Sequence, residues 1–486
     1  MATRIAIDPV TRIEGHLKVE VTADYVGGRQ QVVEARATGT LFRGFESVLR
    51  GRDPFDAPDI TARICGVCPT PHNQAAVAAL DAAMGLQAPE NARLLRNLVL
   101  AADFLHSHVL HFYQLAALDF MAPPSMAPWQ PAWDADIRFD TATSQVLVNH
   151  YVAALDVRRK AHEMGAVFGG RLPHTAAFIG GGFTGMPTAE RIRQYRSYAT
   201  EILAFVRDVY AADVEAVART YSEYFHLGTG PRNLLAFGVF EEDAPGTLHL
   251  LRRGRVDTGS SALQPVDLRA ITEDVASSWY SDLSGLNPAS GSTTASYPKA
   301  DAYSWLKSPR YSGKVYEVGP LARMTVNGDY PGGVSVMDRH QARAAEALKI
   351  AAALQGWLNQ LEPSGPVFAD GRMPGRASGV GLTEAPRGAL GHWLGVSDGA
   401  IARYQVVTPT CWNASPRDAR GVPGALEQAL AGTPVSDTAQ PIEVLRVIHS
   451  FDPCLSCAVH VMRPGRTATV SVSTGGAWSP LAARQA

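Results

Sequence analysis

The strongest constraint on the fold of this chain is a pair of Cys-x-x-Cys motifs that lie near its opposite ends. Cys65 and Cys68 form the first pair, and Cys454 and Cys457 form the second, in a sequence of 486 residues that contains only five cysteines. Two thiols three residues apart can bind one metal ion, and two such pairs make a site of four thiolates. If both pairs serve one site, the two ends of the chain must meet around it.

The spacing of the cysteines alone leaves three kinds of site open. A structural zinc site uses four cysteines, although its two pairs usually lie a few tens of residues apart. Disulfide or redox chemistry is compatible too, but the cysteines are few, and a chain of this length buries enough core without covalent links. A catalytic site for another transition metal that prefers thiolates is the third. The residues around the cysteines must decide among them.

The composition predicts a soluble globular protein that is made in the cytoplasm. Hydrophobic residues make up 46% and charged residues 19% of the chain, and the formal net charge is −2. No Lys/Arg cluster stands out, so we expect no binding to nucleic acid or to an anionic membrane surface. The N-terminus lacks the apolar run of a signal peptide, and no stretch approaches 18 uninterrupted apolar residues, so we expect neither a signal peptide nor a membrane span in this chain.

The local patterns predict an α+β fold that is predominantly α-helical. Short β-branched or alternating runs at residues 3–7, 17–22 and 31–38 predict a small N-terminal β-sheet. From residue 73 the sequence turns helical, with Asn73 as the predicted N-cap and Gly85 as the predicted C-cap. Long central helices are expected near residues 91–119, 143–166, 189–225 and 338–361, the first of them apolar on most sides and therefore buried.

The position of the cysteine pairs predicts one intertwined domain over residues 1–460, with both chain ends meeting at the metal site. Residues 256–300 are rich in Ser, Gly, Asp and Thr, which predicts a long irregular connection in which residues 268–279 could form a short helix. Residues 461–486 are polar and show no helical periodicity. They are therefore expected to be a C-terminal extension outside the core.

The residues that flank the cysteines include groups that a structural zinc site does not need. His72 follows Cys68 by four residues, where it could donate a hydrogen bond to a thiolate and tune its donor strength. Asp452 precedes the second pair, and His460 follows it. These neighbours favour a site with chemistry of its own.

Two further polar residues gain meaning only in combination with the others. Glu14 lies among glycine and proline turn signals, and taken alone it is typical of a solvated surface carboxylate. Arg387 lies between Pro386 and Gly388, where an arginine is more often part of a surface ion pair than catalytic.

Taken together, these segments closely resemble the large, catalytic subunit of nickel–iron hydrogenases of the uptake type. The resemblance runs from the first predicted strand to residue 460, and its segments keep the family's order. They are residues 7–16, 41–46, 63–68, 108–113, 317–323, 384–388, 404–410 and 452–460. A zinc protein would not reproduce the intervening segments, so a structural zinc protein with four cysteine ligands becomes a remote alternative.

The resemblance implies reversible heterolytic oxidation of H2 at a nickel–iron centre. Cys65, Cys68, Cys454 and Cys457 would all bind nickel, and Cys68 and Cys457 would also bridge to an iron that carries carbonyl and cyanide ligands. Soft thiolates suit this chemistry because they are electron-rich. The Cys454 sulfur would take the proton from H2.

The resemblance also assigns roles around the metals. Glu14 would carry the proton from Cys454 towards the surface, which requires a carboxyl whose pKa is raised by burial. Arg387 would overhang the open metal position. The remaining neighbours implied by the family are His72, Pro386, Thr410 and Asp452.

A second metal site is implied at the C-terminus. Glu46, the carbonyl of Val406 and His460 would bind a buried Mg2+, an ion that prefers hard oxygen ligands and water. In the family, a nickel chaperone delivers the metal and an endopeptidase then cuts after the histidine. We therefore expect cleavage between His460 and Val461, which removes residues 461–486.

Three positions bear on the subtype within the family. Ser107 stands where some oxygen-tolerant relatives carry aspartate. Cys411 stands where threonine is expected, and we interpret it as a packed core thiol and not as a fifth ligand. Cys454 is cysteine and not selenocysteine, which predicts the plain nickel–iron type.

The cysteine count predicts a partner. After the four ligands only Cys411 remains, and one cysteine cannot hold an iron–sulfur cluster, so we expect none in this chain. The resemblance implies a heterodimer with an iron–sulfur small subunit, and for membrane-associated enzymes also a membrane cytochrome. The small subunit's twin-arginine signal would bring both chains to a periplasmic or membrane-associated location, with a cytoplasmic location as the alternative.

A second function from the same family is a hydrogen sensor with slow turnover. By family analogy, sensors tend to lack a removable C-terminal extension, whereas residues 461–486 are present here. The sequence therefore favours the enzyme over the sensor.

Overall fold

The protein is described here from a computed structural model that covers residues 2–458, apart from the five positions 128, 131, 134, 245 and 261. For Cys457 and Ala458 only the backbone is described. The predicted magnesium ligand His460 and the predicted extension 461–486 lie outside the described residues.

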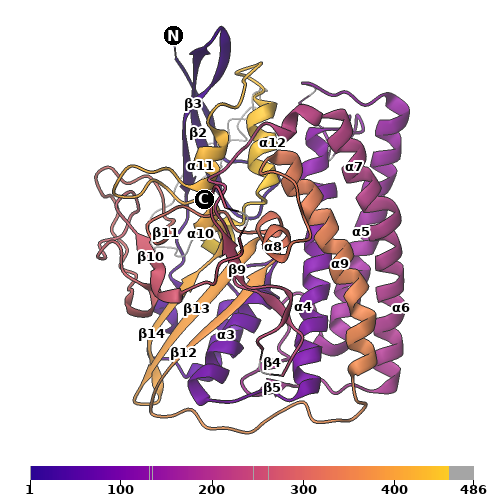
Figure 1. Ribbon diagram of the computed structural model, residues 1–486, viewed down its shortest axis with the longest axis vertical. Helices are drawn as coiled ribbons and strands as arrows, with labels where there is room; N and C mark the ends of the chain where they lie inside the picture. The colour runs from indigo at the N-terminus through magenta and orange to yellow at the C-terminus, as the bar shows by residue number, and fades with distance from the viewer. Residues whose placement is uncertain are drawn as a thin grey trace, which may run out of the picture.

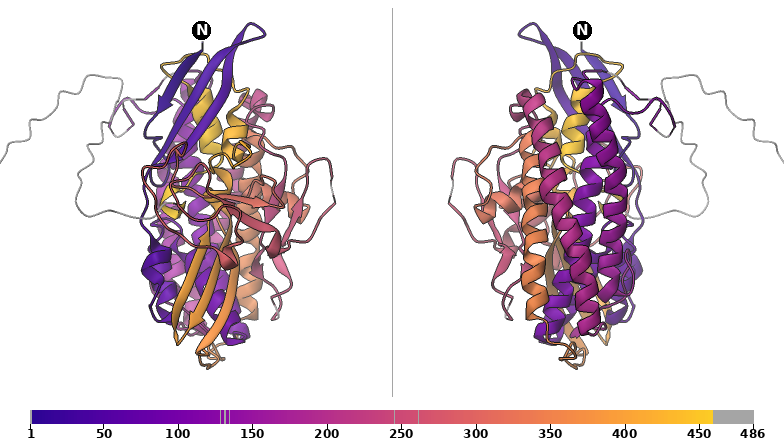
Figure 2. Two further views of the ribbon diagram at one scale, coloured as in Figure 1. Left: turned by 90° about the vertical axis from the view of Figure 1, so that its left-hand side faces the viewer. Right: turned by 90° about the vertical axis from the view of Figure 1, so that its right-hand side faces the viewer.

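Long helices form one side of the molecule, where they run side by side (Figures 1 and 2). They are α4 (Glu90–Leu110), α5 (Thr141–Gly169), α6 (Ala189–Phe205), α7 (Ala211–Thr220) and α9 (Val336–Gln360). Helix α4 is buried along almost its whole length, and α5 and α9 pack against it. Its apolar surface on most sides explains this central position.

The N-terminal sheet is antiparallel, in the order β1 (Thr3–Ile7), β2 (Leu17–Val26) and β3 (Arg29–Gly39). Side chains along β2 alternate between buried and partly buried, as expected for a sheet with one face on the core. Gly27 and Gly28 form the hairpin turn with φ of 60° and 82°, a region that favours glycine. The last two strands extend beyond the predicted ranges because they continue up to this turn.

A second antiparallel sheet was not predicted from the sequence. It consists of β12 (Arg376–Ala385), β13 (Gly388–Ser397) and β14 (Ala400–Val407). Helix α3 (Pro69–Met84) lies directly on β12, where a Cβ atom on Gly379 or Gly381 would be 2.0 or 1.9 Å from a carbonyl oxygen of that helix. Glycines weaken the sequence pattern of a strand, but here they allow the helix to approach the sheet.

Helix α3 begins earlier than predicted. Its first residue is Pro69, which follows Cys68 at the N-cap position, and the predicted N-cap Asn73 lies inside the helix. Proline is favoured in the first turn because no hydrogen-bonded N–H is needed there. Gly85 ends the helix with φ 66°, as predicted.

The predicted short helix at residues 268–279 is wrong. This part contains one 3-10 turn (Leu268–Ala270) and then strand β10 (Ile271–Asp274), which pairs with β11 (Ser308–Tyr311). The side chains of β10 alternate, with Ile271 and Glu273 buried, so the period of two outweighs the helix propensity of the segment.

The remaining elements are short. The further helices are α1 (Phe45–Leu49), α2 (Ala57–Ala62), α8 (Pro320–Asn327), α10 (Pro409–Asn413), α11 (Ala425–Leu430), α12 (Ile442–Ser450) and α13 (Leu455–Ala458). The further strands are β4 (Phe178–Ile179), β5 (Gly182–Phe183), β6 (Leu234–Ala236), β7 (Val239–Glu241), β8 (His249–Leu251) and β9 (Gly254–Val256).

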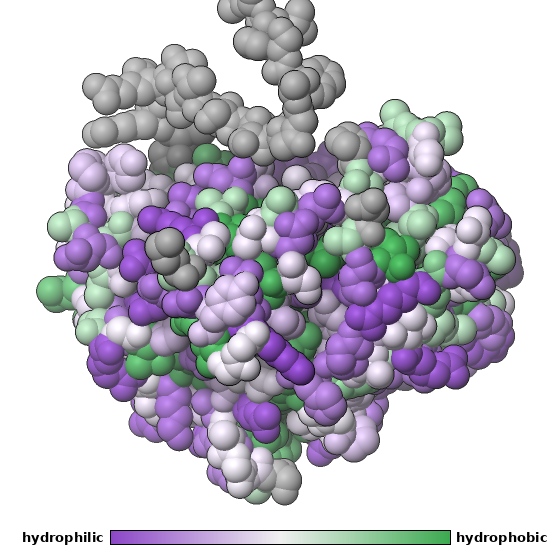
Figure 3. All heavy atoms as spheres, turned by 90° about the horizontal axis from the view of Figure 1, so that it is seen from above, coloured by the Kyte–Doolittle hydropathy of each residue, from purple (hydrophilic) through white to green (hydrophobic). Residues whose placement is uncertain are grey.

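Within the described part of the chain, no helix combines the length and the apolar content needed to cross a bilayer. On the face seen from above in Figure 3, hydrophobic and hydrophilic residues are interspersed. That face therefore does not by itself mark one docking surface.

Candidate metal centre

Three of the four predicted cysteine ligands meet in the interior. The Sγ atoms of Cys65 and Cys68 are 3.0 Å apart, those of Cys65 and Cys454 are 3.4 Å apart, and all three lie within 4.8 Å of one another. None is more than 1% exposed. Only the backbone of Cys457 is described, one turn further along in α13. The structure thus brings the two distant Cys-x-x-Cys motifs to one buried point.

The two chain ends are held together by backbone hydrogen bonds. The Leu455 N–H donates to the Glu14 carbonyl at 2.7 Å, and Glu14 and Cys454 pair as a parallel β-bridge. Gly15 has φ 83°, and a Cβ atom there would lie 2.5 Å from the Ser456 nitrogen. Only glycine can occupy a left-handed position this close to another backbone. The glycine after Glu14 is therefore required for the two ends to touch.

Arg43, which belongs to neither cysteine motif, is hydrogen-bonded to the backbone at both of them. Its guanidinium donates to the carbonyl of Ile64, just before the first pair, and to the carbonyl of Ser456, inside the second, at 2.5 Å for the latter. Within the first pair, the backbone N–H groups of Val67 and Cys68 donate to the Cys65 sulfur at 3.4 and 3.2 Å. Such donors stabilise a thiolate.

A buried group of three side chains fixes the N-terminal segment to α12, the helix that precedes the second cysteine pair. Asp119 accepts a hydrogen bond from Arg12 and lies 2.6 Å from Nδ1 of His449, and Nε2 of His449 lies 3.0 Å from the Thr11 carbonyl. Burial alone would raise the pKa of Asp119, but Arg12 and His449 together lower it below the usual value. The charged carboxylate therefore ties both chain ends to the 3-10 turn Ala117–Asp119, which follows α4 in the sequence.

Glu14 is not the freely solvated carboxylate that its motif alone suggested. Its side chain is partly buried, and one carboxylate oxygen lies 3.8 Å from where a Cβ atom on Gly66 would be, inside the first cysteine pair. Burial, and next the charge of Cys65, raise the pKa of Glu14, while Arg387 and a hydrogen bond with Ser456 oppose the rise. A carboxyl group whose pKa is raised and that lies beside thiolates is suited to accept a proton from them and to release it.

Arg387 is not part of a surface ion pair, because it is only 2% exposed. Its Nε donates to the Asp452 carbonyl at 3.1 Å, and its Nη2 lies 3.0 Å from a carboxylate oxygen of Asp452. Burial alone would lower the pKa of Arg387, but Asp452 and the cysteine thiolates raise it well above the usual value. Among the described residues, Nη2 has only this ion pair with Asp452, and Nη1 has no hydrogen-bond partner.

The loop that carries Arg387 is held by Arg323, a residue to which no sequence pattern gave a role. Arg323 is fully buried and donates to the carbonyls of Ala385 and Pro386 at 2.9 and 2.8 Å. Two buried carboxylates, of Glu346 and Glu384, balance its charge at 2.6 and 2.7 Å. The only sequence signal was its place in the segment 317–323 of the resemblance.

Thr410 and Cys411 lie next to each other in α10 but differ in their contacts. The Thr410 hydroxyl oxygen accepts a hydrogen bond from the Cys454 N–H at 3.0 Å, which leaves its own proton available for donation. Cys411 accepts from the Thr408 hydroxyl at 3.3 Å, and burial raises the pKa of its thiol to about 12. Cys411 is not among the three clustered cysteines, which agrees with a packed core thiol. Ser107 is buried as well.

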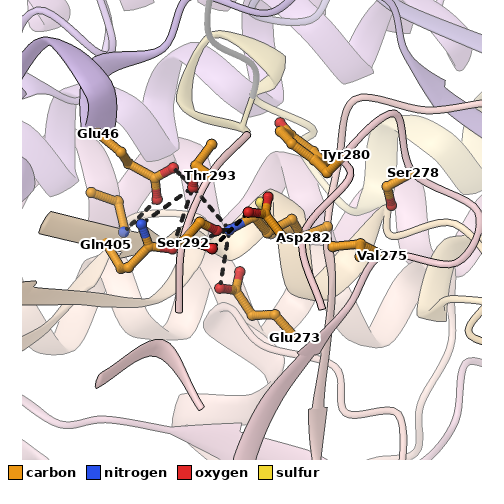
Figure 4. A network of polar contacts seen from close by, with 12 residues as sticks. Glu46, Glu273, Val275, Ser278, Tyr280, Asp282, Ser292, Thr293 and Gln405 are labelled. Carbon is orange, nitrogen blue, oxygen red and sulfur yellow. Dashed lines mark hydrogen bonds and ion pairs between the residues drawn. The ribbon is translucent and has the colours of Figure 1, made fainter. Parts of the chain in front are cut away.

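The predicted magnesium ligand Glu46 lies in a polar network with Thr293 and Gln405 (Figure 4), and Val406 is bonded to it. One carboxylate oxygen of Glu46 accepts from the Val406 N–H at 2.9 Å, and the other accepts from the Thr293 hydroxyl. The Lys307 ammonium lies 3.1 Å from the Gln405 side-chain oxygen. Thr293 comes from the irregular segment 256–300, which therefore contributes to this network.

The donor atoms fit the groups that the resemblance implies. A buried cluster of sulfur atoms suits soft transition metals, and Nη1 of Arg387, which has no hydrogen-bond partner among the described residues, leaves a donor for a bound group. Near Glu46 the donors are carboxylate and amide oxygens, which suit Mg2+.

Comparison with families of known proteins gives one match over most of the chain. A family described as nickel-dependent hydrogenase matches residues 43–137, 122–331 and 329–460, and a family described as HoxL-like matches residues 4–36.

Individual proteins are similar over nearly the whole length. The "Periplasmic [NiFeSe] hydrogenase large subunit" of Desulfomicrobium baculatum is 41% identical, with 94% of this chain and 95% of the relative covered. The "Uptake hydrogenase large subunit" of Rhizobium leguminosarum bv. viciae is 34% identical, with 95% and 96% covered. The solved structure of the Ni-Fe-Se hydrogenase from D. vulgaris Hildenborough in the reduced state has a TM-score of 0.91 at 42% identity, with 95% of this chain and 100% of that chain covered.

Proposed function

The chain belongs to the family of nickel-dependent hydrogenases, and on that premise we propose that Cys65, Cys68, Cys454 and Cys457 are the ligands of its nickel–iron centre. As a large subunit of the uptake type, the chain is the catalytic part of an oxidoreductase that acts on H2. The observation that carries the ligand proposal is the cluster of three buried sulfur atoms within 4.8 Å of one another.

The division of the ligands follows the family. Cys65 and Cys454 would bind nickel alone, and Cys68 and Cys457 would bridge nickel and iron, with carbonyl and cyanide on the iron. When bound, the centre supplies an electron-rich metal position at which H2 is polarised and split heterolytically. Two of the similar proteins are named for selenium, but both pairs of this chain consist of cysteine, so we assign it the plain nickel–iron type.

The proton leaves through Glu14 in this proposal. The backbone bridge between Glu14 and Cys454 keeps the carboxyl close to the terminal thiolate, and burial raises the pKa of that carboxyl. Glu14 therefore takes the proton from the Cys454 sulfur and passes it towards the surface.

Arg387 lies over the open metal position in this proposal. The Asp452 backbone and carboxylate fix the orientation of the guanidinium, and its Nη1, which has no hydrogen-bond partner among the described residues, would serve the place where H2 reacts. Pro386 and Thr410 surround the diatomic ligands of iron, and the Thr410 proton is available to a cyanide nitrogen.

Glu46, the Val406 carbonyl and His460 form the magnesium site in this proposal, with Thr293, Gln405 and Lys307 around it. The ion pins the C-terminus of the mature chain against the β12–β14 sheet. Residues 1–460 then form one intertwined domain, since the N-terminal segment, the segment 256–300 and the C-terminal segment all contribute to the two metal sites.

A small subunit with iron–sulfur clusters is the partner expected for a large subunit of this family. Electrons leave through it, because this chain has no further set of four cysteines. By analogy with the periplasmic relative we place the heterodimer in the periplasm, exported through the small subunit's twin-arginine signal and able to donate to a membrane cytochrome.

Maturation is proposed to include loading by a nickel chaperone and cleavage by an endopeptidase between His460 and Val461. The intact mass of the large subunit in the active heterodimer should then correspond to residues that end at His460, apart from any N-terminal processing. A mass that still includes residues 461–486 would refute this scheme and would favour the sensor.

Serine variants test the ligand set. Cys454→Ser is expected to lose most of the bound nickel and all measurable H2 oxidation, because a neutral hydroxyl is a poor ligand for a soft metal. Cys411→Ser is the matched control, since Cys411 is also a buried thiol but lies outside the cluster, and it should retain nickel. Nickel at wild-type level in Cys454→Ser, or zinc as the main metal of the wild-type protein, would overturn the proposal.

A further inference from the structure

A chain of three buried polar rings leads from the first cysteine pair into the β12–β14 sheet. His72 in α3 lies with its Nδ1 3.2 Å from Nε2 of His392 in β13, and Nδ1 of His392 lies 2.7 Å from the hydroxyl oxygen of Tyr404 in β14. The three residues are at most 1% exposed. His392 and Tyr404 have no part in the proposed metal ligation or proton transfer.

The groups that these two contacts join limit the direction of each hydrogen bond. A phenol hydroxyl has one proton to donate, and a ring nitrogen of histidine that accepts a hydrogen bond carries no proton, so its imidazole is neutral. A neutral imidazole has one N–H donor and one acceptor nitrogen, so the direction of each hydrogen bond is fixed once one proton is located.

The tyrosine locates that proton. Among the described residues, the Tyr404 hydroxyl has His392 as its only hydrogen-bond partner. If Nδ1 of His392 carried the proton, the phenol would have to accept it, and its own O–H would be buried without an acceptor, which is costly. The phenol therefore donates to Nδ1 of His392. The proton of His392 is then on Nε2 and is donated to Nδ1 of His72, which leaves the proton of His72 on its Nε2.

His72 lies on the same helix as the first cysteine pair. Cys68 is the N-cap of this helix, and His72 follows one turn later, where helical side chains lean back towards the preceding turn. The charge of Cys65 opposes the lowering of the His72 pKa, which agrees with a position of the ring on the cysteine side of α3. A hydrogen bond to a metal-bound thiolate lowers the electron density on sulfur and tunes the redox potential of the metal.

We propose that Tyr404 and His392 are positioning residues that hold His72 in the Nε2–H tautomer, so that it donates a hydrogen bond to the thiolates of the cysteine cluster. The hydrogen-bonded series Tyr404–His392–His72 affects the electronic state of the metal centre and not its assembly. This inference rests on the proposed nickel ligands, because the tuning needs a metal bound to those sulfurs.

Variants of the holoenzyme test the role of these hydrogen bonds. The quantity measured is the midpoint potential of the enzyme's nickel couple, from an EPR-monitored titration. Tyr404→Phe removes only the hydroxyl, and His392→Leu removes both nitrogens. Both are expected to keep nickel and to shift the potential to more negative values, because the thiolates become more electron-rich, with the larger shift for His392→Leu.

Two controls separate tuning from packing. Tyr195→Phe removes an equally buried hydroxyl that donates to the Leu98 carbonyl, and its potential should equal that of the wild type. His392→Gln keeps one acceptor and one donor on a planar amide and should restore most of the wild-type potential. Equal potentials in wild type, Tyr404→Phe and His392→Leu at full nickel content would overturn the inference, as would a His392→Gln potential equal to that of His392→Leu.

Neutron diffraction of the deuterated wild-type heterodimer tests the tautomers directly, even if a variant fails to fold. We expect deuterons on Nε2 of His392 and on Nε2 of His72, and none on Nδ1 of either ring. A deuteron on Nδ1 of His392 would refute the proposed directions of the hydrogen bonds. Absence of nickel from the wild-type protein would instead refute the proposed ligands.

Discussion

Replacing Glu14 by glutamine is expected to lower H2 oxidation by about 10²–10⁴-fold, the usual range for loss of a positioned acid–base group, while nickel and iron stay bound. The amide has nearly the same shape but cannot accept a proton. The backbone bridge between Glu14 and Cys454 does not involve the side chain, so the metal ligands should keep their positions. H/D exchange and metal content, measured on one preparation, separate these effects.

Glu20→Gln is the matched control for this variant. Glu20 lies in β2, the strand that follows Glu14 in the sequence, and pairs with the exposed Arg4 at 2.7 Å, an interaction that contributes little. Its turnover should equal that of the wild type. Normal turnover and exchange in Glu14→Gln would mean that the proton leaves by another route, and Glu14 would then have no part in the mechanism.

Replacing Arg387 by lysine is expected to lower kcat/KM for H2 by about 10²–10³-fold, the effect seen when one oriented donor is removed from a site of charge development. The guanidinium uses Nε and Nη2 to hold Asp452 and still presents Nη1. A lysine ammonium is one point charge on a flexible chain, so it cannot do both. Nickel content should not change, because Arg387 is not a proposed ligand.

Arg403→Lys serves as the control for Arg387→Lys, because Arg403 is exposed on β14, in the same sheet. Steady-state rates at several H2 concentrations check both variants. Full activity in Arg387→Lys would leave Arg387 with a role in packing only.

The metal site was far more predictable from the sequence than the sheet that supports it. A cysteine pair is a local signal with a definite chemistry, so the meeting of Cys65 and Cys454 could be predicted from the sequence alone. Strands β12 and β13 carry glycines at positions where α3 or neighbouring chain approaches, such as Gly379 and Gly381, and these conceal the strand pattern. Their reason lies in tertiary contacts that a single sequence does not display.

The residues that position the site were hidden for a similar reason. Arg43 and Arg323 act by donating to backbone carbonyls of distant segments, and no local pattern distinguishes such an arginine from one on the surface. The predicted N-cap Asn73 was wrong because a generic capping rule was applied within a segment where Cys68 and Pro69 begin the helix. The motifs of Glu14 and Arg387, each taken alone, favoured solvent-exposed side chains, whereas Glu14 is partly buried and Arg387 is buried, because burial depends on the far end of the chain.

The central claim is that both cysteine pairs bind one nickel–iron centre, and anomalous X-ray scattering from crystals of the mature heterodimer tests it most directly. Data collected on both sides of the nickel and iron absorption edges should place one nickel within bonding distance of Cys65, Cys68, Cys454 and Cys457, with one iron beside it. A zinc signal at the cysteine cluster, or nickel bound away from these four sulfurs, would contradict the account.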